Sequence, residues 1–304
     1  MASVNVIILA SGSGLRFGDN QPKQFTKLAG LPVIIHTLKI FDSFAEVNKI
    51  IVVTNDEYVD HVWDLVSKYA LRKVHKVVGG GATRQESSRI GLACCDPDTD
   101  FVLIHDGVRP FVSHQVLHRL VEAVRVHGAV DTVIPSADTL VEVDEGNFIR
   151  NIPDRSRFRR GQTPQAFSYQ LISQAHRLSR EAGVENSTDD CALVLRMGHP
   201  VFVVEGEEQN IKITYPLDLH LADKLFQLNA LSPRALGDIS PYFDGRVLAI
   251  IGGTQGIGAA IADLLRRRGS VKVYALGRTS LPAIEVTDPR SEEHTSELQS
   301  RITI

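Results

Sequence analysis

The chain has 304 residues, of which 43% are hydrophobic and 23% are charged, and its formal net charge is −3. A chain of this length is expected to form one large domain or two modest ones, and the small net charge argues against a surface for nucleic acids or anionic membranes. No apolar run approaches the ~18 residues of a membrane-spanning helix, and no signal peptide precedes the first expected strand. The three cysteines, Cys94, Cys95 and Cys191, lack metal-ligand spacing, so a reducing cytoplasm is the expected location.

Short apolar runs rich in Val and Ile alternate with amphipathic stretches along the first 230 residues. The runs, which we expect to be buried parallel strands, span 4–10, 49–55, 74–80, 101–107, 129–136 and 201–206. The amphipathic stretches, which we expect to be helices, span 32–44, 58–70, 83–95 and 114–128. This alternation predicts a three-layer, Rossmann-like α/β domain whose ligands bind beyond the carboxyl ends of the strands.

The stretch after the first strand, LASGSGLRFGDNQPKQF, is rich in glycine and contains the cations Arg16 and Lys23. It lacks the Gly-Lys-Ser/Thr of a Walker loop, and its proline would interrupt the helix that follows a dinucleotide-binding turn. Backbone N–H donors combined with two flexible cations suit a triphosphate whose charge changes during a reaction. The loop therefore predicts a site of phosphate chemistry.

Two segments interrupt the α/β alternation. Residues 139–153 alternate apolar and polar side chains on both sides of DEGN, which predicts a β-hairpin that serves either as an arm over the site or as a dimer clasp. A closing helix is expected over 218–231, so we place the first domain at 1–229. Prolines and glycines without periodicity then predict a linker at 230–245.

Motifs spread over residues 4–225 resemble the sugar-phosphate nucleotidylyltransferases, and PKQF points to their cytidylyltransferase branch. The motifs that follow in order are GGGATRQES, HDGVRPF, GAVDTVIPSADT, GQTPQAF, STDDCALV and GEEQNIKITYPLDL. The set is similar to the 2-C-methyl-erythritol 4-phosphate cytidylyltransferases, and closer to their relatives that use D-ribitol 5-phosphate. Ser11 departs from the family's usual glycine, and Ala82 stands where the erythritol-phosphate enzymes often carry an acidic residue.

The resemblance implies a GT-A-like nucleotidyltransferase fold and transfer of CMP from CTP to a polyol phosphate, with release of pyrophosphate. A phosphate dianion is already a nucleophile, so positioning and charge stabilisation suffice for this reaction. The implied catalytic cations are Arg16, Lys23 and Lys212, and Asp106 is the implied Mg²⁺ ligand.

The resemblance also implies how the two substrates are held. The implied CTP ligands are Ala10, Ser11, Gly12, Gly14, Gly80, Gly81, Ser87 and Asp106. The implied acceptor ligands are Arg109, Thr139, Arg155, Thr163 and Thr188. Arg84 is expected to brace the nucleotide loop and His105 to be structural. In the family the hairpin arm crosses to the partner subunit, which implies a homodimer.

A second glycine-rich turn begins a separate unit, which we place at 246–289. Gly252, Gly256 and Gly258 follow a strand and open a helix without a cation in the turn, which favours the static pyrophosphate of a dinucleotide. The unit resembles the start of a short-chain dehydrogenase/reductase, and Arg278 would favour NADP. The family's tyrosine–lysine pair is not found after it, so NADPH is expected only for a longer gene product.

Residues 290–304 have no apolar periodicity, and 290–300 resemble a translated sequencing adapter. We expect this tail to be non-native and the natural gene to continue past about Pro289.

Three alternatives to a ribitol-phosphate cytidylyltransferase remain at this point. They are the methylerythritol-phosphate enzyme, a ribulose 5-phosphate reductase in the full-length gene, and a nucleotide-binding module without catalysis. The fusion of the two units favours the CDP-ribitol route that supplies bacterial surface polymers.

Overall fold

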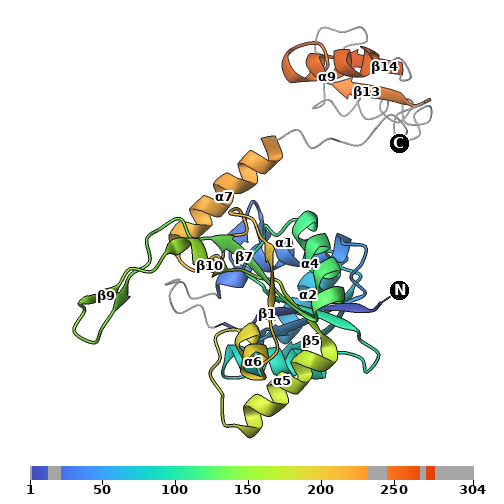
Figure 1. The fold of residues 1–304 in the computed structure, drawn as a ribbon. Coiled ribbons are helices and arrows are strands. Elements are labelled where there is room, and N and C mark those ends of the chain that lie inside the picture. The colour runs from blue at the N-terminus through green and yellow to red at the C-terminus, as the bar shows by residue number, and fades with distance from the viewer. Residues whose placement is uncertain (1, 13–21, 232–244, 268–271, 278–304) are drawn as a thin grey trace. The chain divides into compact units, whose positions relative to one another are not determined.

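The computed structural model describes residues 2–12, 22–231, 245–267 and 272–277 (Figure 1). The chain divides into two compact units, Met1–Asn229 and Ala230–Ile304. No helix in the described ranges is long and apolar enough to cross a membrane.

The first unit is built on an eight-stranded sheet with the order β10-β7-β11-β6-β1-β4-β5, and β12 also pairs with β7. The six strands expected from the sequence are present as β1 (Val4–Ala10), β4 (Lys49–Thr54), β5 (Val74–Gly79), β6 (Phe101–Asp106), β7 (Ala129–Pro135) and β12 (Phe202–Glu205). Strand pairs β1–β4, β1–β6, β4–β5 and β7–β12 are parallel. The α/β prediction is therefore confirmed.

The sheet also contains two antiparallel strands that the sequence did not indicate. Strand β11 (Gln165–Ser168) lies between β6 and β7 and is antiparallel to both, and β10 (Arg159–Gly161) is antiparallel to β7. Both strands are short, and the exposed Arg159–Gly161 has no apolar run to signal it. The sheet is consequently mixed.

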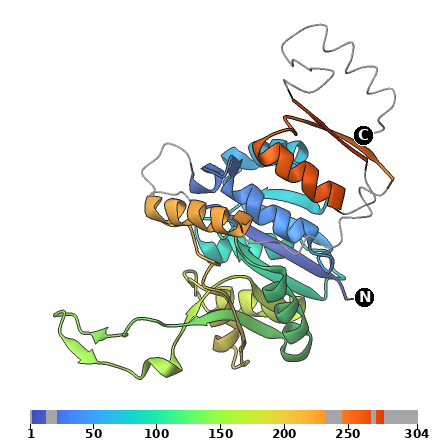
Figure 2. The same ribbon diagram turned by 90° about the horizontal axis from the view of Figure 1, so that it is seen from above.

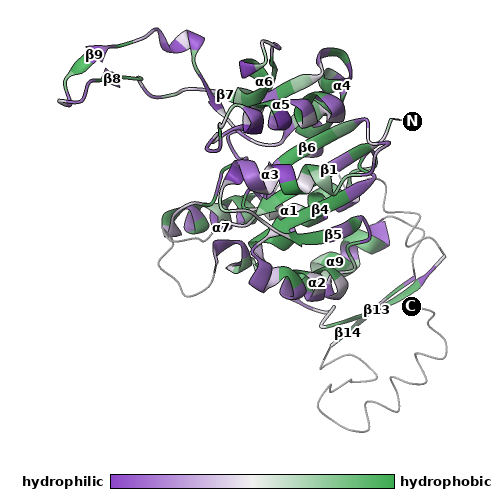
Figure 3. Cartoon of the chain, turned by 90° about the horizontal axis from the view of Figure 1, so that it is seen from below, coloured by the Kyte–Doolittle hydropathy of each residue, from purple (hydrophilic) through white to green (hydrophobic). Residues whose placement is uncertain are grey.

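Helices cover both faces of this sheet. They are α1 (Val33–Ser43), α2 (Val59–Lys68), α3 (Arg84–Ala93), α4 (His114–His127), α5 (Tyr169–Glu181), α6 (Asp190–Arg196) and α7 (Pro216–Leu231). Alternate residues of β1 enter different cores: Val6 and Ile8 pack with α1, α2 and α4, whereas Ile7 and Leu9 pack with α3, α5 and α6. Figure 3 shows the resulting hydrophobic strands between helices with hydrophilic outer surfaces.

Gly91 sets the approach of α3 to the sheet. A Cβ atom at this position would lie 2.5 Å from Cγ2 of Ile7 and 3.1 Å from Cγ2 of Val53. Such a separation is shorter than van der Waals contact, so only glycine lets α3 lie this close to β1 and β4. The first turn of α3 therefore sits directly beside the carboxyl end of β1.

The predicted hairpin is present as an arm that projects from the first unit (Figure 2). Its strands β8 (Glu142–Val143) and β9 (Ile149–Asn151) are antiparallel. The carboxylate of Asp144 closes the turn by accepting hydrogen bonds from the backbone N–H groups of Gly146 and Phe148 at 2.9 and 3.0 Å. Phe148 and Ile149 are 71% and 58% exposed, so the arm presents apolar side chains without a core of its own.

The second unit contains the expected strand–turn–helix–strand order in β13 (Val247–Ile251), α9 (Gly256–Arg267) and β14 (Lys272–Leu276). The two strands are parallel. In the turn, Gly252 and Gly256 have positive φ values of +75° and +55°, which glycine adopts without strain. The predicted NADP residue Arg278 and the predicted tail 290–304 lie outside the described residues.

Candidate active site

Asp106 ends β6 at the carboxyl edge of the sheet and lies at the centre of a group of cations. Its carboxylate is 3.0 Å from Nζ of Lys212, 3.2 Å from Nε of Arg109 and 3.9 Å from Nε of Arg84. The Asp106 residue is only 7% exposed. The structure thus brings together two predicted ligands of different substrates, Arg109 and Lys212, around the predicted metal ligand.

These cations determine the charge state of the site. Burial raises the pKa of Asp106, but the nearby Lys212, Arg84 and Arg109 outweigh it and hold that pKa well below its usual range. The carboxylate is therefore ionised at neutral pH. Because Lys212 and Arg109 together exceed its single charge, the surrounding field favours a polyanion.

A chain of hydrogen bonds fixes the strand end that carries Asp106. The hydroxyl of Thr163 accepts from the backbone N–H of Asp106 at 3.1 Å and bonds to Nδ1 of His105 at 3.0 Å. Nε2 of His105 bonds to the carbonyl of Arg109 at 3.1 Å, so this nitrogen carries the proton and Nδ1 accepts from Thr163. Burial lowers the pKa of His105 to about 4, which keeps the ring neutral in a structural position.

These hydrogen bonds affect how the predicted role of Thr163 is interpreted. Its hydroxyl was expected to contact the acceptor, yet the structure engages it with Asp106 and His105, and the residue is 6% exposed. These contacts show that Thr163 helps to hold the strand end, and its contact with the acceptor stays a prediction. The reason is the antiparallel β11, whose preceding residues come alongside the end of β6.

The loop that carries Lys212 is tied to the same edge of the sheet. Arg109 donates from Nη1 to the carbonyl of Asn210 at 2.9 Å, and Nδ2 of Asn210 donates to the carbonyl of Thr163 at 2.9 Å. One residue past Lys212, the N–H of Ile213 donates to the carbonyl of Val108 at 3.0 Å. Lys212 itself keeps 42% of its side chain exposed, so a fixed backbone presents a cation with room to move.

The predicted nucleotide pocket is assembled from three segments. The hydroxyls of Ser11 and Ser87 lie 2.8 Å apart, and the N–H of Gly81 donates to Ser87 at 3.2 Å. A Cβ at Gly80 would lie 2.6 Å from Cβ of Ser11, so this close approach requires glycine. Thr83 caps α3 by accepting from the N–H of Glu86 at 3.1 Å, which fixes the turn that carries Ser87.

The opening loop is described only at its two ends. Ala10 is buried and accepts a hydrogen bond from Nε2 of Gln24 at 2.7 Å, while Gly12 is exposed. Lys23 begins a short 3₁₀ helix, Lys23–Phe25, and is half-buried. The predicted residues Gly14 and Arg16 lie outside the described ranges, so their roles stay predictions.

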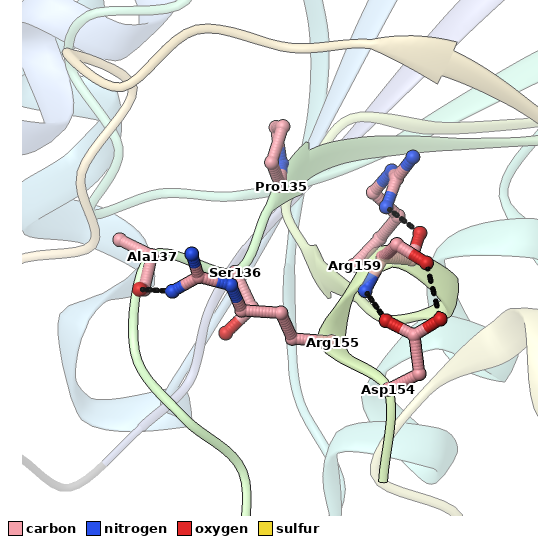
Figure 4. A pocket seen from close by; sticks show the side chains of 7 residues that line it. Pro135, Ser136, Ala137, Asp154, Arg155 and Arg159 are labelled. Atoms are coloured by element: carbon pink, nitrogen blue, oxygen red, sulfur yellow. Dashed lines mark hydrogen bonds between the residues drawn. The ribbon is translucent and has the colours of Figure 1, made fainter.

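In the part of the chain that the structure describes, the remaining predicted acceptor ligands form no hydrogen bond or ion pair with the Asp106 group. Thr139, Arg155 and Thr188 are exposed, and Nη1 of Arg155 donates to the carbonyl of Ala137 at 3.0 Å. Arg155 and Arg159 line a cavity of about 450 Å³ at the base of the arm (Figure 4). Within the described ranges, no ion pair joins this cavity to the Asp106 group.

Magnesium fits this site as an ion held mainly by substrate. Asp106 is the carboxylate that faces the cations, and no group of three or more His, Cys, Asp or Glu residues in the described part of the chain could hold a metal alone. Mg²⁺ commonly binds through one or two carboxylates together with phosphate oxygens and water. The donor set therefore matches a metal that arrives with a nucleoside triphosphate.

Sequence reasoning missed a buried polar network behind the site. Asp190, the first residue of α6, is 1% exposed and receives bonds from Arg84, Ser88 and His176 at 2.6, 2.8 and 2.9 Å. The adjacent acidic pair in STDDCALV was the available signal. It indicates a helix start, however, and gives no information on which helices meet there.

A strand-end carboxylate surrounded by cations, at the carboxyl edge of an α/β sheet, is an arrangement suited to phosphate chemistry. The chain belongs to the 2-C-methyl-D-erythritol 4-phosphate cytidylyltransferase family, whose model matches residues 4–227. It is a cytidylyltransferase.

Curated relatives divide between two acceptors. The chain is 37% identical over 295 residues to the bifunctional ribulose 5-phosphate reductase/CDP-ribitol pyrophosphorylase Bcs1 of Haemophilus influenzae, covering 94% of this chain and 61% of that protein. It is 37% identical to the ribitol-5-phosphate cytidylyltransferase of Vibrio parahaemolyticus, covering 71% of this chain and 92% of that protein. It is also 40% identical to the 2-C-methyl-D-erythritol 4-phosphate cytidylyltransferase of Syntrophus aciditrophicus, covering 72% and 94% respectively. The chain thus spans less than two thirds of the bifunctional relative.

Solved structures agree with the fold. The 4-diphosphocytidyl-2C-methyl-D-erythritol synthase of Anaerococcus prevotii matches with a TM-score of 0.67 at 33% identity, covering 74% of this chain and 96% of that one. The 2-C-methyl-D-erythritol 4-phosphate cytidylyltransferase of Thermus thermophilus matches with a TM-score of 0.61 at 34% identity, covering 74% and 99%. The predicted nucleotidyltransferase fold is confirmed.

Proposed function

We propose that this chain transfers CMP from CTP to D-ribitol 5-phosphate in the cytoplasm, giving CDP-ribitol and pyrophosphate. The observation that carries the choice of acceptor is the match to the Haemophilus protein, which extends over 94% of this chain and so includes the second unit. The Vibrio relative supports the same acceptor for the first unit alone.

The reaction needs no general base. An oxygen of the acceptor phosphate attacks the α-phosphorus of CTP in line with the departing pyrophosphate. Lys212 compensates the charge that develops on the α-phosphate, while Lys23 and Arg16 hold the triphosphate. Asp106 would hold Mg²⁺, which neutralises phosphate charge when bound.

The acceptor is held by groups from two subunits in this proposal. Arg109 lies beside Asp106, whereas Arg155 and Thr139 lie at the base of the arm. Exposed apolar side chains on the arm, including Phe148 and Ile149, are suited to a second copy of the chain. A homodimer would bring Arg155 of one subunit to the Asp106 group of the other.

Methylerythritol phosphate is the second candidate acceptor, because the Syntrophus relative is 40% identical over the first unit. We do not assign reduction of ribulose 5-phosphate with NADPH to the described part of this chain. Two described strands and one helix after residue 245 carry the turn but cannot form a complete reductase.

Pyrophosphate release tests the assignment directly. The purified chain would be given CTP and Mg²⁺ with either D-ribitol 5-phosphate or 2-C-methyl-D-erythritol 4-phosphate over a range of concentrations. We expect kcat/KM to be at least tenfold higher with the ribitol ester. Equal or faster turnover with the methylerythritol ester would overturn the acceptor, and no release with either would overturn both candidates.

A further inference from the structure

Asp190 joins three helices at one buried carboxylate behind the active site. It begins α6, accepts from Ser88 and from Arg84 on α3, and bonds to Nε2 of His176 on α5. Burial raises the pKa of Asp190, but the guanidinium of Arg84 and the bond from His176 outweigh it and keep that pKa low. A buried carboxylate that stays ionised with three donors is a strong anchor for those donors.

Arg84 lies between this anchor and the active-site carboxylate. Its Nη1 is 2.6 Å from Asp190, whereas its Nε is 3.9 Å from Asp106. Arg84 therefore makes its short bond to Asp190 and its longer contact to Asp106, the predicted metal ligand. The planar guanidinium spans both carboxylates at once, which a lysine could not do.

The three cations near Asp106 differ in how they are held. Lys212 is 42% exposed and touches the carboxylate from an open side, while the side chains of Arg84 and Arg109 are 24% and 11% exposed. Incoming phosphates would compete with Asp106 for the exposed ammonium of Lys212. Arg84 cannot move toward the phosphates in the same way, because it is also bonded to the buried carboxylate of Asp190.

We propose that Asp190 is a positioning residue for cytidylyl transfer: it retains Arg84 and thereby keeps Asp106 oriented and open toward metal and triphosphate. Without the charge on Asp190, Arg84 closes onto Asp106 and competes with the metal for the same oxygens. The proposal rests on cytidylyl transfer with Asp106 as metal ligand, and it is independent of which polyol phosphate is the acceptor.

The test is a double-mutant cycle with D190N, R84Q and the double variant. We expect each single variant to lower kcat by about 10- to 100-fold, as is typical when a group that orients a metal ligand is lost. KM for CTP should change by less than about threefold. Since Asp190 acts through Arg84, the double variant should be no slower than the slower single variant.

A second measurement does not depend on turnover. Mn²⁺ binding to the enzyme–CTP complex would be followed by electron paramagnetic resonance without acceptor. D190N should weaken Mn²⁺ binding by about tenfold or more, because Arg84 then occupies the carboxylate. Unchanged Mn²⁺ affinity in D190N would overturn the proposal, even if kcat falls.

Ser88→Ala is the matched control, because it removes another donor from the same buried carboxylate and leaves Arg84 in place. It should lower the melting temperature while kcat and Mn²⁺ affinity stay within about twofold of wild type. A loss of kcat in S88A equal to that in D190N would show a purely structural role. If D190N does not fold, R84K supplies the test, since lysine keeps the charge but cannot span both carboxylates, and full activity in R84K would refute the proposal.

If the wild type released no pyrophosphate with either polyol phosphate, the proposed function would be refuted, but the proposed role of Asp190 would not. The Mn²⁺ measurement in the CTP complex would still decide the role of Asp190.

Discussion

Nζ of Lys212 lies 3.0 Å from the carboxylate of Asp106, although the lysine side chain is 42% exposed and the aspartate side chain only 10%. Because the lysine ammonium is on the solvent-exposed side of the pair, it can leave the carboxylate and bind a phosphate without a movement of the backbone. Lys212 therefore compensates the charge of Asp106 in this structure, and in the proposed reaction the same ammonium turns to the α-phosphate.

Lys212→Ala should lower kcat by about 100- to 1000-fold, as the loss of one preorganised donor to a developing charge does elsewhere. KM for CTP should rise much less, because the interaction is strongest in the transition state. Steady-state pyrophosphate release measures both constants. Lys224→Ala, on the exposed surface of α7, is the control, and a rise in KM at constant kcat in K212A would show uniform substrate binding instead.

Asp106→Asn should raise the Mg²⁺ concentration needed for half-maximal rate by about tenfold or more, since the carboxylate proposed to hold the metal is lost. Chelation with EDTA should abolish turnover in the wild type and excess Mg²⁺ should restore it. Melting curves would check that D106N is folded. An unchanged Mg²⁺ requirement in this variant would remove Asp106 from the metal site.

Thr163→Val should lower the free energy of unfolding by about 1–3 kcal/mol, because the buried backbone N–H of Asp106 loses its hydrogen-bond acceptor. Thr163→Ser keeps the hydroxyl and should retain most of that stability. Denaturant unfolding gives the difference between the two variants. If T163S were as unstable as T163V, or if T163V changed only KM for the acceptor, the hydroxyl would belong to the substrate rather than to the strand end.

Ionisation of Asp131 should lower the free energy of unfolding as the pH rises from about 4 to 6. Burial raises the pKa of this carboxyl from 3.8 to about 6 despite the hydrogen bond from Gln165. In this window the folded state binds more protons than the unfolded state, so the free energy of unfolding falls with rising pH. Urea unfolding of wild type and D131N between pH 4 and 7 should show a shallower decline in the variant.

Parallel slopes for wild type and D131N would contradict this assignment. Asp98→Asn, on the exposed loop before β6, is the control for the loss of one carboxylate elsewhere on the chain.

The sequence predicted the parts of this enzyme that depend on local pattern. Val and Ile runs identified the six parallel strands, and the alternating pattern around DEGN identified the arm. Strand β11 was not predicted, because Gln165–Ser168 is short and its burial depends on the neighbouring strands β6 and β7. The contacts of Thr163 with Asp106 and His105 could not be anticipated for the same reason, since a reversed strand brings the residues that precede it to the end of β6.

The site was predictable only residue by residue. Motifs indicated Asp106, Arg109 and Lys212 individually, and the structure places them within one hydrogen-bonded group. The network at Asp190 could not be predicted, because its partners lie on two other helices, α3 and α5, and no spacing in the sequence encodes their meeting.

Gly91 sets how deeply α3 settles on Ile7, and the same helix carries Ser87, a predicted nucleotide ligand. A larger residue at position 91 would lift the helix and carry Ser87 away from Ser11. If Ser87 binds the nucleotide as predicted, a core position that faces Ile7 and Val53 controls the shape of the nucleotide site, and engineering of that site has a route that leaves every predicted ligand unaltered.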